Sequence, residues 1–501
     1  MSTRRQLAYA AGAPGFASID HVVGTMLLYF YLPPPGRGLV AQLPQETLFG
    51  PLTAFGIAML IARTVDSVAS PLIGHASDIS RSRLGHRRAF MLFGLLPMLA
   101  LPLLAYWPPS DVGGAINAVW LTGVLSCYYV FATMYTGPHG ALIPEIARSD
   151  DERARLTRLL ALCAFPMAGL LMTWPRGIDW GREVGLAPTE SMRAIVIVLA
   201  LVAFVLCSIP LFAIDEKRFT ERVEPETVSL RESLASVLAN RPFRIFLGAH
   251  VLFASAASLI FPVLPYLATV LLGRSEGFAF DLSASLGLMI AVGYAIVPRL
   301  LGSLRPKKIL LISFFIFGVA AAALGMVEPS GPGQPQDVRN LAIAFISLGV
   351  MGLAIAGVSL LPNVLVGQLI DEDAARGGTN RSALFLGVMR AFDKWAFGLS
   401  AAMIAFLFVR FGNGPDNPLG VQLVGPIAAV LGLGAVLMLS RFPEERSEEP
   451  LPRLSWEAQV SRRAAGKARG RGCSELQQGL ATHAAVMDRR MGVATSLGSG
   501  S

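Results

Sequence analysis

The chain has 501 residues, of which 53% are hydrophobic and only 15% are charged. Soluble proteins carry about 25% charged residues, so this composition excludes a water-soluble globular protein. The formal net charge of +8 would suit a nucleic-acid-binding protein. In so apolar a chain, however, we attribute the excess of Lys and Arg to membrane topology and expect no nucleic-acid partner.

Long apolar runs bounded by charged residues, Pro or Gly recur along the chain, and twelve spans of roughly 22 residues fit within it. The sequence therefore predicts an all-α membrane protein with twelve transmembrane helices. The first run follows Arg4 and Arg5 as in a signal peptide, but it contains Asp20 and His21, and we expect it to be retained as the first span. The predicted spans lie at about 14–32, 48–73, 89–107, 115–146, 157–174, 192–214, 244–272, 283–301, 309–327, 340–369, 383–409 and 420–440.

A charged stretch separates the runs into two sets of six. The ends of the fourth and tenth spans have similar acidic sequences at 144–153 and 367–376, which indicates an internal repeat. Many secondary transporters are built from duplicated halves. The predicted domains are an N-terminal six-helix bundle (1–214), a cytosolic connector (215–243), a C-terminal six-helix bundle (244–440) and a disordered cytosolic tail (441–501).

Arginine and lysine are concentrated in alternate loops. The stretches at 81–88, 148–158 and 299–308 each contain several, whereas the intervening loops contain few, such as Arg37 and Arg339. Cytoplasmic loops are enriched in these residues. We therefore expect a multi-pass protein of the cell inner (plasma) membrane with both termini in the cytoplasm.

The second predicted span contains two ionisable residues. Arg63 and Asp66 are three residues apart and therefore share one face of a helix, and either charge alone would be costly in hydrocarbon. Intramembrane acids often mark ion pathways. The sequence leaves open whether the two form a structural ion pair or part of a cation or proton site.

Three blocks of residues together resemble the glycoside-pentoside-hexuronide:cation symporter family, the melibiose-permease-like branch of the major facilitator superfamily. The resemblance spans about residues 7–440. It implies the major facilitator fold with two six-helix bundles, alternating access, and uptake of a small solute driven by a proton or sodium gradient. The blocks are Arg63, Asp66, Pro71, Gly74 and Asp78 with the arginines of 81–88; 137–145 followed by Asp151, Glu152 and Arg153; and Leu361 and Pro362 through 371–373 to Lys394.

The resemblance also implies roles for individual residues. Asp66 falls on the first of the family's cation-site carboxylates, and Lys394 falls on the lysine of the eleventh span that lies near that site. The chain departs from the sodium-using members at two positions. Ser70 replaces a second acid one turn after the first, and Thr136 replaces an acid before the proline of the fourth span.

These departures bear on the coupling ion. Sodium needs several hard oxygen ligands, and one carboxylate with two hydroxyls, beside the Lys394 ammonium, supplies little negative charge. A proton needs only one titratable acid. We therefore expect proton coupling rather than sodium coupling, although hydroxyls and backbone carbonyls can also complete a sodium site. The predicted coupling residues are Asp66, Lys394, Arg63, Ser70 and Thr136, with no cofactor besides H⁺ or Na⁺.

Other polar residues are candidates for binding the solute, each with a structural alternative. His139 follows Pro138 and can instead cap backbone groups freed by the proline. Arg390 lies four residues before Lys394 and can belong to a structural charge network. Arg158 is the basic residue nearest to Leu160, where the family's sugar-contacting arginine falls. The predicted solute-binding residues are Asp20, His139, Arg158, Arg390 and Asp393.

The resulting prediction is a monomeric secondary transporter, a symporter of a glycoside or another small polar solute, whose partners are that solute and the bilayer. The chain has no GxxxxGK[ST] motif and no metal-ligand spacing, so we expect neither ATP-driven transport nor an enzyme. Two alternatives remain. One is a transporter or exporter of a lipid-like or amphipathic compound, and the other is a transport-inactive membrane sensor or assembly protein.

Overall fold

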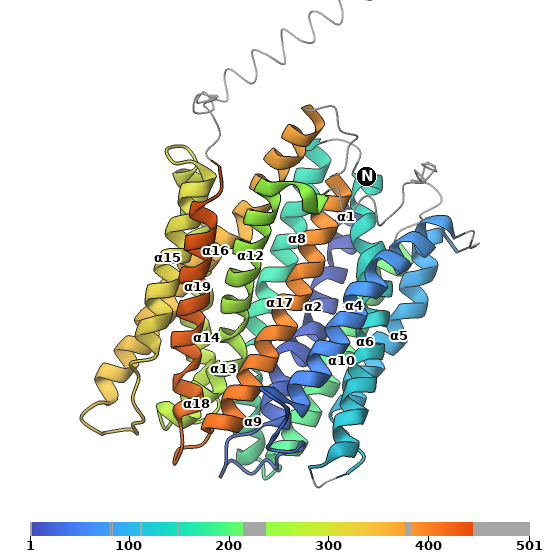
Figure 1. Cartoon of the computed structure of the whole chain (residues 1–501). Coiled ribbons are helices and arrows are strands. Elements are labelled where there is room, and N and C mark those ends of the chain that lie inside the picture. The colour runs from blue at the N-terminus through green and yellow to red at the C-terminus, as the bar shows by residue number, and fades with distance from the viewer. Residues whose placement is uncertain are drawn as a thin grey trace, which may run out of the picture. The chain divides into compact units, whose positions relative to one another are not determined.

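The computed structural model describes residues 3–80, 82, 84–110, 113–147, 150–213, 237–375 and 382–443, which belong to one unit that ends at Pro443. The predicted tail from residue 444 and most of the predicted connector lie outside the described residues, as do residues 148–149 and 376 of the two similar acidic stretches. The described residues are mostly helical (Figure 1).

The first half of the chain contains one small antiparallel β-hairpin, β1 (Thr47–Phe49) with β2 (Leu52–Thr53). Its helices are α1 (Thr3–Ala10), α2 (Gly12–His21), the π-helix η1 (Val22–Met26), α3 (Leu27–Tyr31), α4 (Ala54–Ile79), α5 (His86–Ala105), α6 (Ala115–Ala141), α7 (Ile143–Ile146), α8 (Asp150–Leu171), α9 (Trp174–Glu183) and α10 (Pro188–Ala213).

The second half is helical in its described residues. Its helices are α12 (Arg241–Ser258), α13 (Ile260–Tyr266), the π-helix η3 (Leu267–Leu271), α14 (Phe278–Leu300), α15 (Pro306–Leu324), α16 (Asp337–Ala375), α17 (Ser382–Phe411), α18 (Leu419–Gln422) and α19 (Val424–Ser440).

Within the described ranges, eleven helical segments are long and apolar enough to cross a membrane. The remaining predicted span corresponds to α2, η1 and α3, which follow one another from Gly12 to Tyr31 but are individually short because the π-helix interrupts the α-helical hydrogen bonding. Together these segments agree with the predicted all-α fold of twelve membrane helices. The fifth span is longer than predicted, Arg155–Glu183, because α9 continues it beyond Thr173.

The helices pack mainly against others of the same half of the chain. In the first half, α6 packs against α4 and α5, and α2 packs against α8 and α10; in the second, α16 packs against α14 and α15, and α19 against α12 and α15. Contacts between the halves include α4 against α17 and α9 against α14 (Figure 1). The helices that carry Asp66 and Lys394 are therefore direct neighbours.

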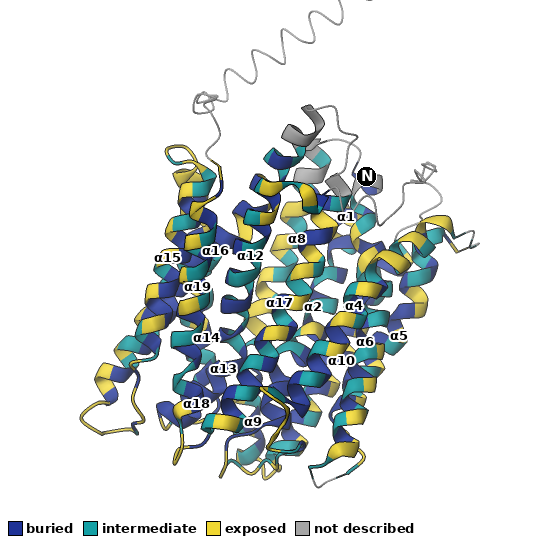
Figure 2. Cartoon of the chain, viewed as in Figure 1, coloured by how far each residue is buried: buried dark blue, intermediate teal, exposed yellow. Residues whose placement is uncertain are grey.

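The spans expose many large apolar side chains, among them Phe93, Val198 and Phe212 (Figure 2). In a soluble protein such a surface would drive aggregation, but lipid tails are as apolar as leucine and solvate it without cost. The exposed apolar faces therefore fit helices that contact the bilayer.

Candidate functional site

Asp66 is the centre of a buried polar cluster. The residue lies on α4 and is 2% exposed. Its Oδ1 accepts hydrogen bonds from Lys394 Nζ at 2.6 Å and Thr133 Oγ1 at 2.7 Å, and its Oδ2 lies 3.4 Å from Arg63 Nη1. A buried carboxylate is stable only when it is paired and hydrogen-bonded. Here α4, α6 and α17 each contribute a donor.

The Lys394 ammonium lies among three side-chain oxygens. Besides Asp66, it donates to Ser70 Oγ at 2.6 Å, and it is 3.5 Å from Thr133 Oγ1. Because Lys394 comes from α17 and the oxygens come from α4 and α6, this ion pair joins the second half of the chain to the first. Any change in the charge of Asp66 therefore acts directly on the contact between the halves.

Arg63 provides a second positive charge next to Asp66. Its guanidinium carbon lies 4.0 Å from the ring centroid of Tyr129 and 4.5 Å from that of Phe397, positions that favour a cation–π interaction. Its Nη2 is 3.9 Å from Oδ1 of Asp20, whose side chain is 62% exposed. Arg63 thus connects the buried carboxylate of Asp66 to an exposed carboxylate in the first span.

The local sequence explains how α4 presents this cluster. Arg63, Asp66 and Ser70 follow the i, i+3, i+7 spacing of one helix face. At the start of α4, Thr53 caps the helix by accepting a hydrogen bond from Gly56 N at 3.1 Å. On the facing helix, a Cβ on Gly398 would lie 3.2 Å from the Cβ of Arg63, so the glycine permits α17 to approach closely.

The residue of α6 that contacts Asp66 is Thr133 rather than the predicted Thr136. The hydroxyl of Thr136 donates to the backbone oxygen of Ala132 at 2.9 Å. The two threonines are three residues apart and share a helix face, so the sequence indicates the correct face. Which turn lies level with Asp66 depends on how far α6 is shifted along α4, and the sequence contains no signal for that shift.

His139 lies in an aromatic cluster and is 3% exposed. Its ring stacks on Tyr9 with centroids 4.3 Å apart, and Phe16 approaches it edge-on at 5.7 Å. The Tyr9 hydroxyl also donates to the His139 backbone oxygen. The structure therefore gives His139 a packing position between α1, α2 and α6.

The other predicted solute-binding residues are less covered. Arg158 on α8 and Arg390 on α17 are exposed. Arg390 Nη1 is 3.8 Å from Oδ2 of Asp393, and Oδ1 of the same carboxylate is 2.7 Å from His250 Nε2 on α12. The partner of His250 lies 143 residues further along the chain, so the local sequence gives no sign of this contact.

A second buried ionic contact lies at the opposite end of the bundle from the start of α1 (Figure 1). The Glu276 side chain is fully buried and accepts hydrogen bonds from Arg182 Nη1 at 2.5 Å, Arg182 Nη2 at 2.8 Å and the Tyr29 hydroxyl at 3.0 Å. Arg37 Nη1 is 4.0 Å from its Oε2. We call Tyr29, Arg37, Arg182 and Glu276 the outer cluster.

Electrostatics favour the charged form of Glu276. Burial of the carboxyl opposes its ionisation, but the hydrogen bonds and the charge of Arg182 outweigh burial, so the pKa of Glu276 lies below its ordinary value. Beside it, Asp179 Oδ2 accepts a hydrogen bond from Gly277 N at 2.9 Å. These contacts join α3 and α9 of the first half to the loop before α14 of the second.

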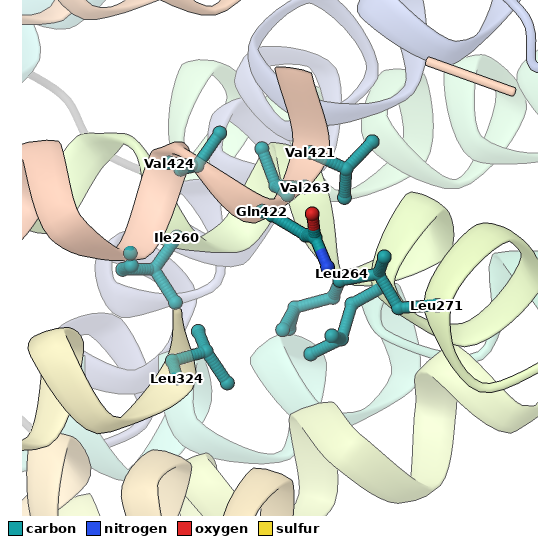
Figure 3. Close-up of a pocket in the computed structure, with 10 residues that line it drawn as sticks. Ile260, Val263, Leu264, Leu271, Leu324, Val421, Gln422 and Val424 are labelled. Atoms are coloured by element: carbon teal, nitrogen blue, oxygen red, sulfur yellow. The ribbon is translucent and has the colours of Figure 1, made fainter. Parts of the chain in front are cut away.

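The pocket between α13, η3, α15, α18 and α19 is unsuited to a polar solute (Figure 3). It measures about 10 Å³, which is room for one water molecule. Nine of its ten lining residues are apolar or Gly, and the amide nitrogen of the tenth, Gln422, donates to the backbone oxygen of Val327 at 3.2 Å. A wider groove of about 490 Å³, which is also largely apolar, lies between α8, α9 and α10.

Comparison with known proteins assigns the chain to a family of transporters. Residues 8–443 match the model of a family described as MFS/sugar transport proteins. The chain is 24% identical over 417 residues to the uncharacterized symporter YnaJ of Bacillus subtilis, covering 82% of this chain and 84% of that protein. It is 28% identical over 196 residues to the putative glycoside/cation symporter YagG of Escherichia coli, covering 38% of this chain and 40% of that protein.

Solved structures show the same fold at low sequence identity. A D-xylose-proton symporter is similar with a TM-score of 0.59 and 13% identity, over 88% of this chain and 97% of that one. The nucleoside transporter NupG is similar with a TM-score of 0.61 and 12% identity, over 89% of this chain and all of that one. The chain therefore belongs to the MFS/sugar transport protein family of the major facilitator superfamily, whose members are transporters and not enzymes.

Proposed function

We propose that the protein is a proton-coupled symporter that carries a glycoside or another small polar solute by alternating access. The observation behind the proposal is the buried Asp66 carboxylate, paired across the halves with Lys394 at 2.6 Å. Protonation of Asp66 removes its charge and weakens its attraction for Lys394. Proton binding and the movement of α4 relative to α17 are coupled in this way.

The position of Lys394 supports protons rather than sodium as the coupling ion. Its ammonium is within 2.6 Å of both Asp66 and Ser70 and therefore occupies the space among the oxygens that a bound cation would need. Sodium would have to displace this tethered positive charge and bind next to it at a cost in repulsion. A proton binds the carboxylate without displacing anything.

The exposed ionisable residues support a solute path next to this cluster. Asp20, Arg158 and Arg390 are exposed, and each belongs to a helix of a membrane span, Arg158 at its start. Charges at this depth face water rather than lipid because of their cost in hydrocarbon. We propose that these three side chains bind hydroxyl or carboxylate groups of the solute. The name of the relative YagG, a putative glycoside/cation symporter, supports a glycoside.

The proposal extends to the state of the protein in the cell. We propose that it works as a monomer in the bacterial inner membrane with both termini in the cytoplasm. The start of α1 and the end of α19 lie at the same end of the bundle, as an even number of membrane crossings requires (Figure 1). The concentration of Lys and Arg in alternate loops favours the cytoplasm for that end.

The test is a pH recording of a lightly buffered suspension of de-energised cells that express the protein, after addition of each member of a panel of glycosides. One compound is expected to make the medium alkaline, and Asp66→Asn is expected to abolish this signal. Glu328→Gln is the control, since Glu328 forms an exposed pair with Arg339 within the second half of the chain. A wild-type protein that is present in the membrane yet silent with every compound would refute proton–glycoside symport.

A second candidate function is transport of an amphipathic compound, and the groove between α8, α9 and α10 favours it. The groove is lined by residues such as Leu170, Trp180 and Val198. In that case the pH recording stays silent with glycosides. Instead, substitution of Val198 by Trp, which fills the groove, is expected to slow the movement of a fluorescent lysolipid in proteoliposomes.

A further inference from the structure

A second titratable pair lies in the second half of the chain, apart from the Asp66 cluster. His250 on α12 is 9% exposed, and its Nε2 lies 2.7 Å from Asp393 Oδ1 on α17. The ring of Phe246 stacks on the imidazole at a centroid distance of 5.8 Å and holds its orientation. The proposed coupling mechanism uses neither side chain of this pair.

The second ring nitrogen of His250 is the position at which the pair would take up a proton. With Nε2–H donated to the Asp393 carboxylate, Nδ1 is left with a free lone pair, and Nδ1 is buried with no hydrogen-bond partner in the described structure. A proton from water that forms an N–H bond at Nδ1 creates an imidazolium next to the carboxylate. The Asp393 carboxylate stabilises this imidazolium, because an opposite charge at hydrogen-bonding distance favours the charged form of the ring.

When His250 is neutral, the Arg390 guanidinium offsets the negative charge of Asp393. Its Nη1 is 3.8 Å from Asp393 Oδ2, and its side chain is 67% exposed. When the imidazolium neutralises the carboxylate, the attraction between Arg390 and Asp393 weakens. The guanidinium is then available to bind another partner on its exposed side.

The other helices around His250 contribute little charge. Besides α17, α12 packs against α13, α16 and α19. Along Val424–Ser440 α19 has no ionisable residue, and the one on α13, Tyr266, donates to the backbone oxygens of Leu28 and Leu32. Lys394 on α17 binds Asp66. The remaining charged residues of these helices lie towards the helix ends and are Arg241, Arg244, Asp337, Arg339, Asp371, Glu372, Asp373 and Arg410.

We propose that His250 and Asp393 form a second proton-binding site, distinct from Asp66, and that its protonation frees Arg390 to bind the solute. The existence of the site is independent of the proposed function, whereas its use in transport rests on that function. A purely structural hydrogen bond would hold the same geometry but would leave His250 in one protonation state across the pH range in which the protein is folded.

The site itself is tested by nuclear magnetic resonance of the full-length protein in nanodiscs with ¹⁵N-labelled histidine. His250→Gln, which preserves a donor near the position of Nε2, identifies the His250 signals. We expect them to show a protonation transition. Asp393→Asn is expected to move this transition at least about one pH unit lower, because the opposite charge is lost. The exposed His75 on α4 is the internal control, and its signals should be unchanged by Asp393→Asn.

A His250 signal that does not titrate, or a transition unmoved by Asp393→Asn, would overturn the site. Its use in transport is tested with the solute identified by the pH recording. His250→Gln is expected to retain the alkalinisation that depends on Asp66 but to carry one proton fewer per solute. An unchanged ratio would overturn the role in transport. Silence of the wild-type protein in the recording would refute the symport proposal alone, because the resonance experiment needs no solute.

Discussion

At the scale of single residues, the most important feature is that the Asp66 carboxylate is paired with two cationic side chains. It lies 2.6 Å from Lys394 and 3.4 Å from Arg63, and a hydroxyl of Thr133 completes its environment. Removing one partner of a buried pair leaves an uncompensated charge, which costs more than the pair itself contributes. Neutralising one charge of the cluster is therefore expected to lower the stability of the protein. Neutralising two opposite charges together is expected to lower it less.

A double-mutant cycle tests this coupling. Asp66→Asn and Lys394→Met are each expected to destabilise the protein, while the double variant is expected to be more stable than the sum of the two effects by about 1–3 kcal/mol. The measurement is equilibrium unfolding in mixed micelles. The exposed pair of Glu328 and Arg339, at 2.7 Å, is the control cycle, and its coupling should be below about 1 kcal/mol. Equal coupling in the two cycles would contradict the central role of Asp66.

At the scale of elements, the outer cluster joins the two halves at one end of the molecule. Glu276 lies in the loop before α14, and its donors come from α3 and α9 of the other half. Alternating access requires the halves to separate at this end at some point of the cycle. The cluster is stable only while the end is closed, so it stabilises the closed state over the open one.

Substitution of Glu276 is expected to open this end. Spin labels on Glu183→Cys and Ser275→Cys, with the native cysteines replaced by serine, report the distance between α9 and the loop before α14. Glu276→Gln should shift the population towards longer distances, because the neutral amide no longer attracts Arg182. Glu328→Gln, which breaks an exposed pair within the second half, should leave the distances unchanged. Unchanged distances in Glu276→Gln together with longer distances in Glu328→Gln would exclude the outer cluster as the contact that holds this end closed.

Acid is expected to open the same end. The pKa of Glu276 in the closed state is below its ordinary value, which is about 4.3 for an exposed carboxyl. The stabilisation by its charge is therefore fully present above that ordinary value and is lost as the pH falls through the lowered one. The same spin-label distances should lengthen at low pH in the wild-type background and should not depend on pH in Glu276→Gln.

At the scale of the whole molecule, the two halves contact each other through α4 with α17 and α9 with α14. The Asp66 cluster lies at the first of these contacts, whereas the outer cluster bridges α9 and the loop that leads into α14. In the proposed symport, a proton bound at the Asp66 cluster and an opening at the outer cluster are two events in the same relative movement of the halves. If both termini are in the cytoplasm, as proposed, the outer cluster faces the outside of the cell.

Reporter fusions test that orientation. Alkaline phosphatase is active only where its disulfides form, outside the cytoplasm. A fusion after Phe442 is expected to be inactive, and a fusion after Gln334, in the loop between α15 and α16, is expected to be active. Each is compared with a fluorescent-protein fusion at the same position to show that the chain is made. Activity after Phe442 would invert the topology.

The amino-acid sequence by itself determined the spans and the positions of the important charges. Membrane spans are recognisable because apolar length is a local property, and Asp66, Lys394 and Arg390 stand out because charges are rare in hydrocarbon. The largest differences between the predicted and the observed spans also have local causes. The π-helix at Val22–Met26 divides the first span, and α9 extends the fifth.

Only the tertiary structure decided which charges meet. Lys394 and Asp66 are 328 residues apart, Glu276 and Arg182 are 94 apart, and the contact of Thr133 with Asp66 depends on one turn of α6. Membrane helices are apolar on almost every side, so their sequences contain little information on how each is rotated or shifted against its neighbours. Packing between helices sets that rotation, and with it the Asp66 cluster, the outer cluster and the pair of His250 with Asp393.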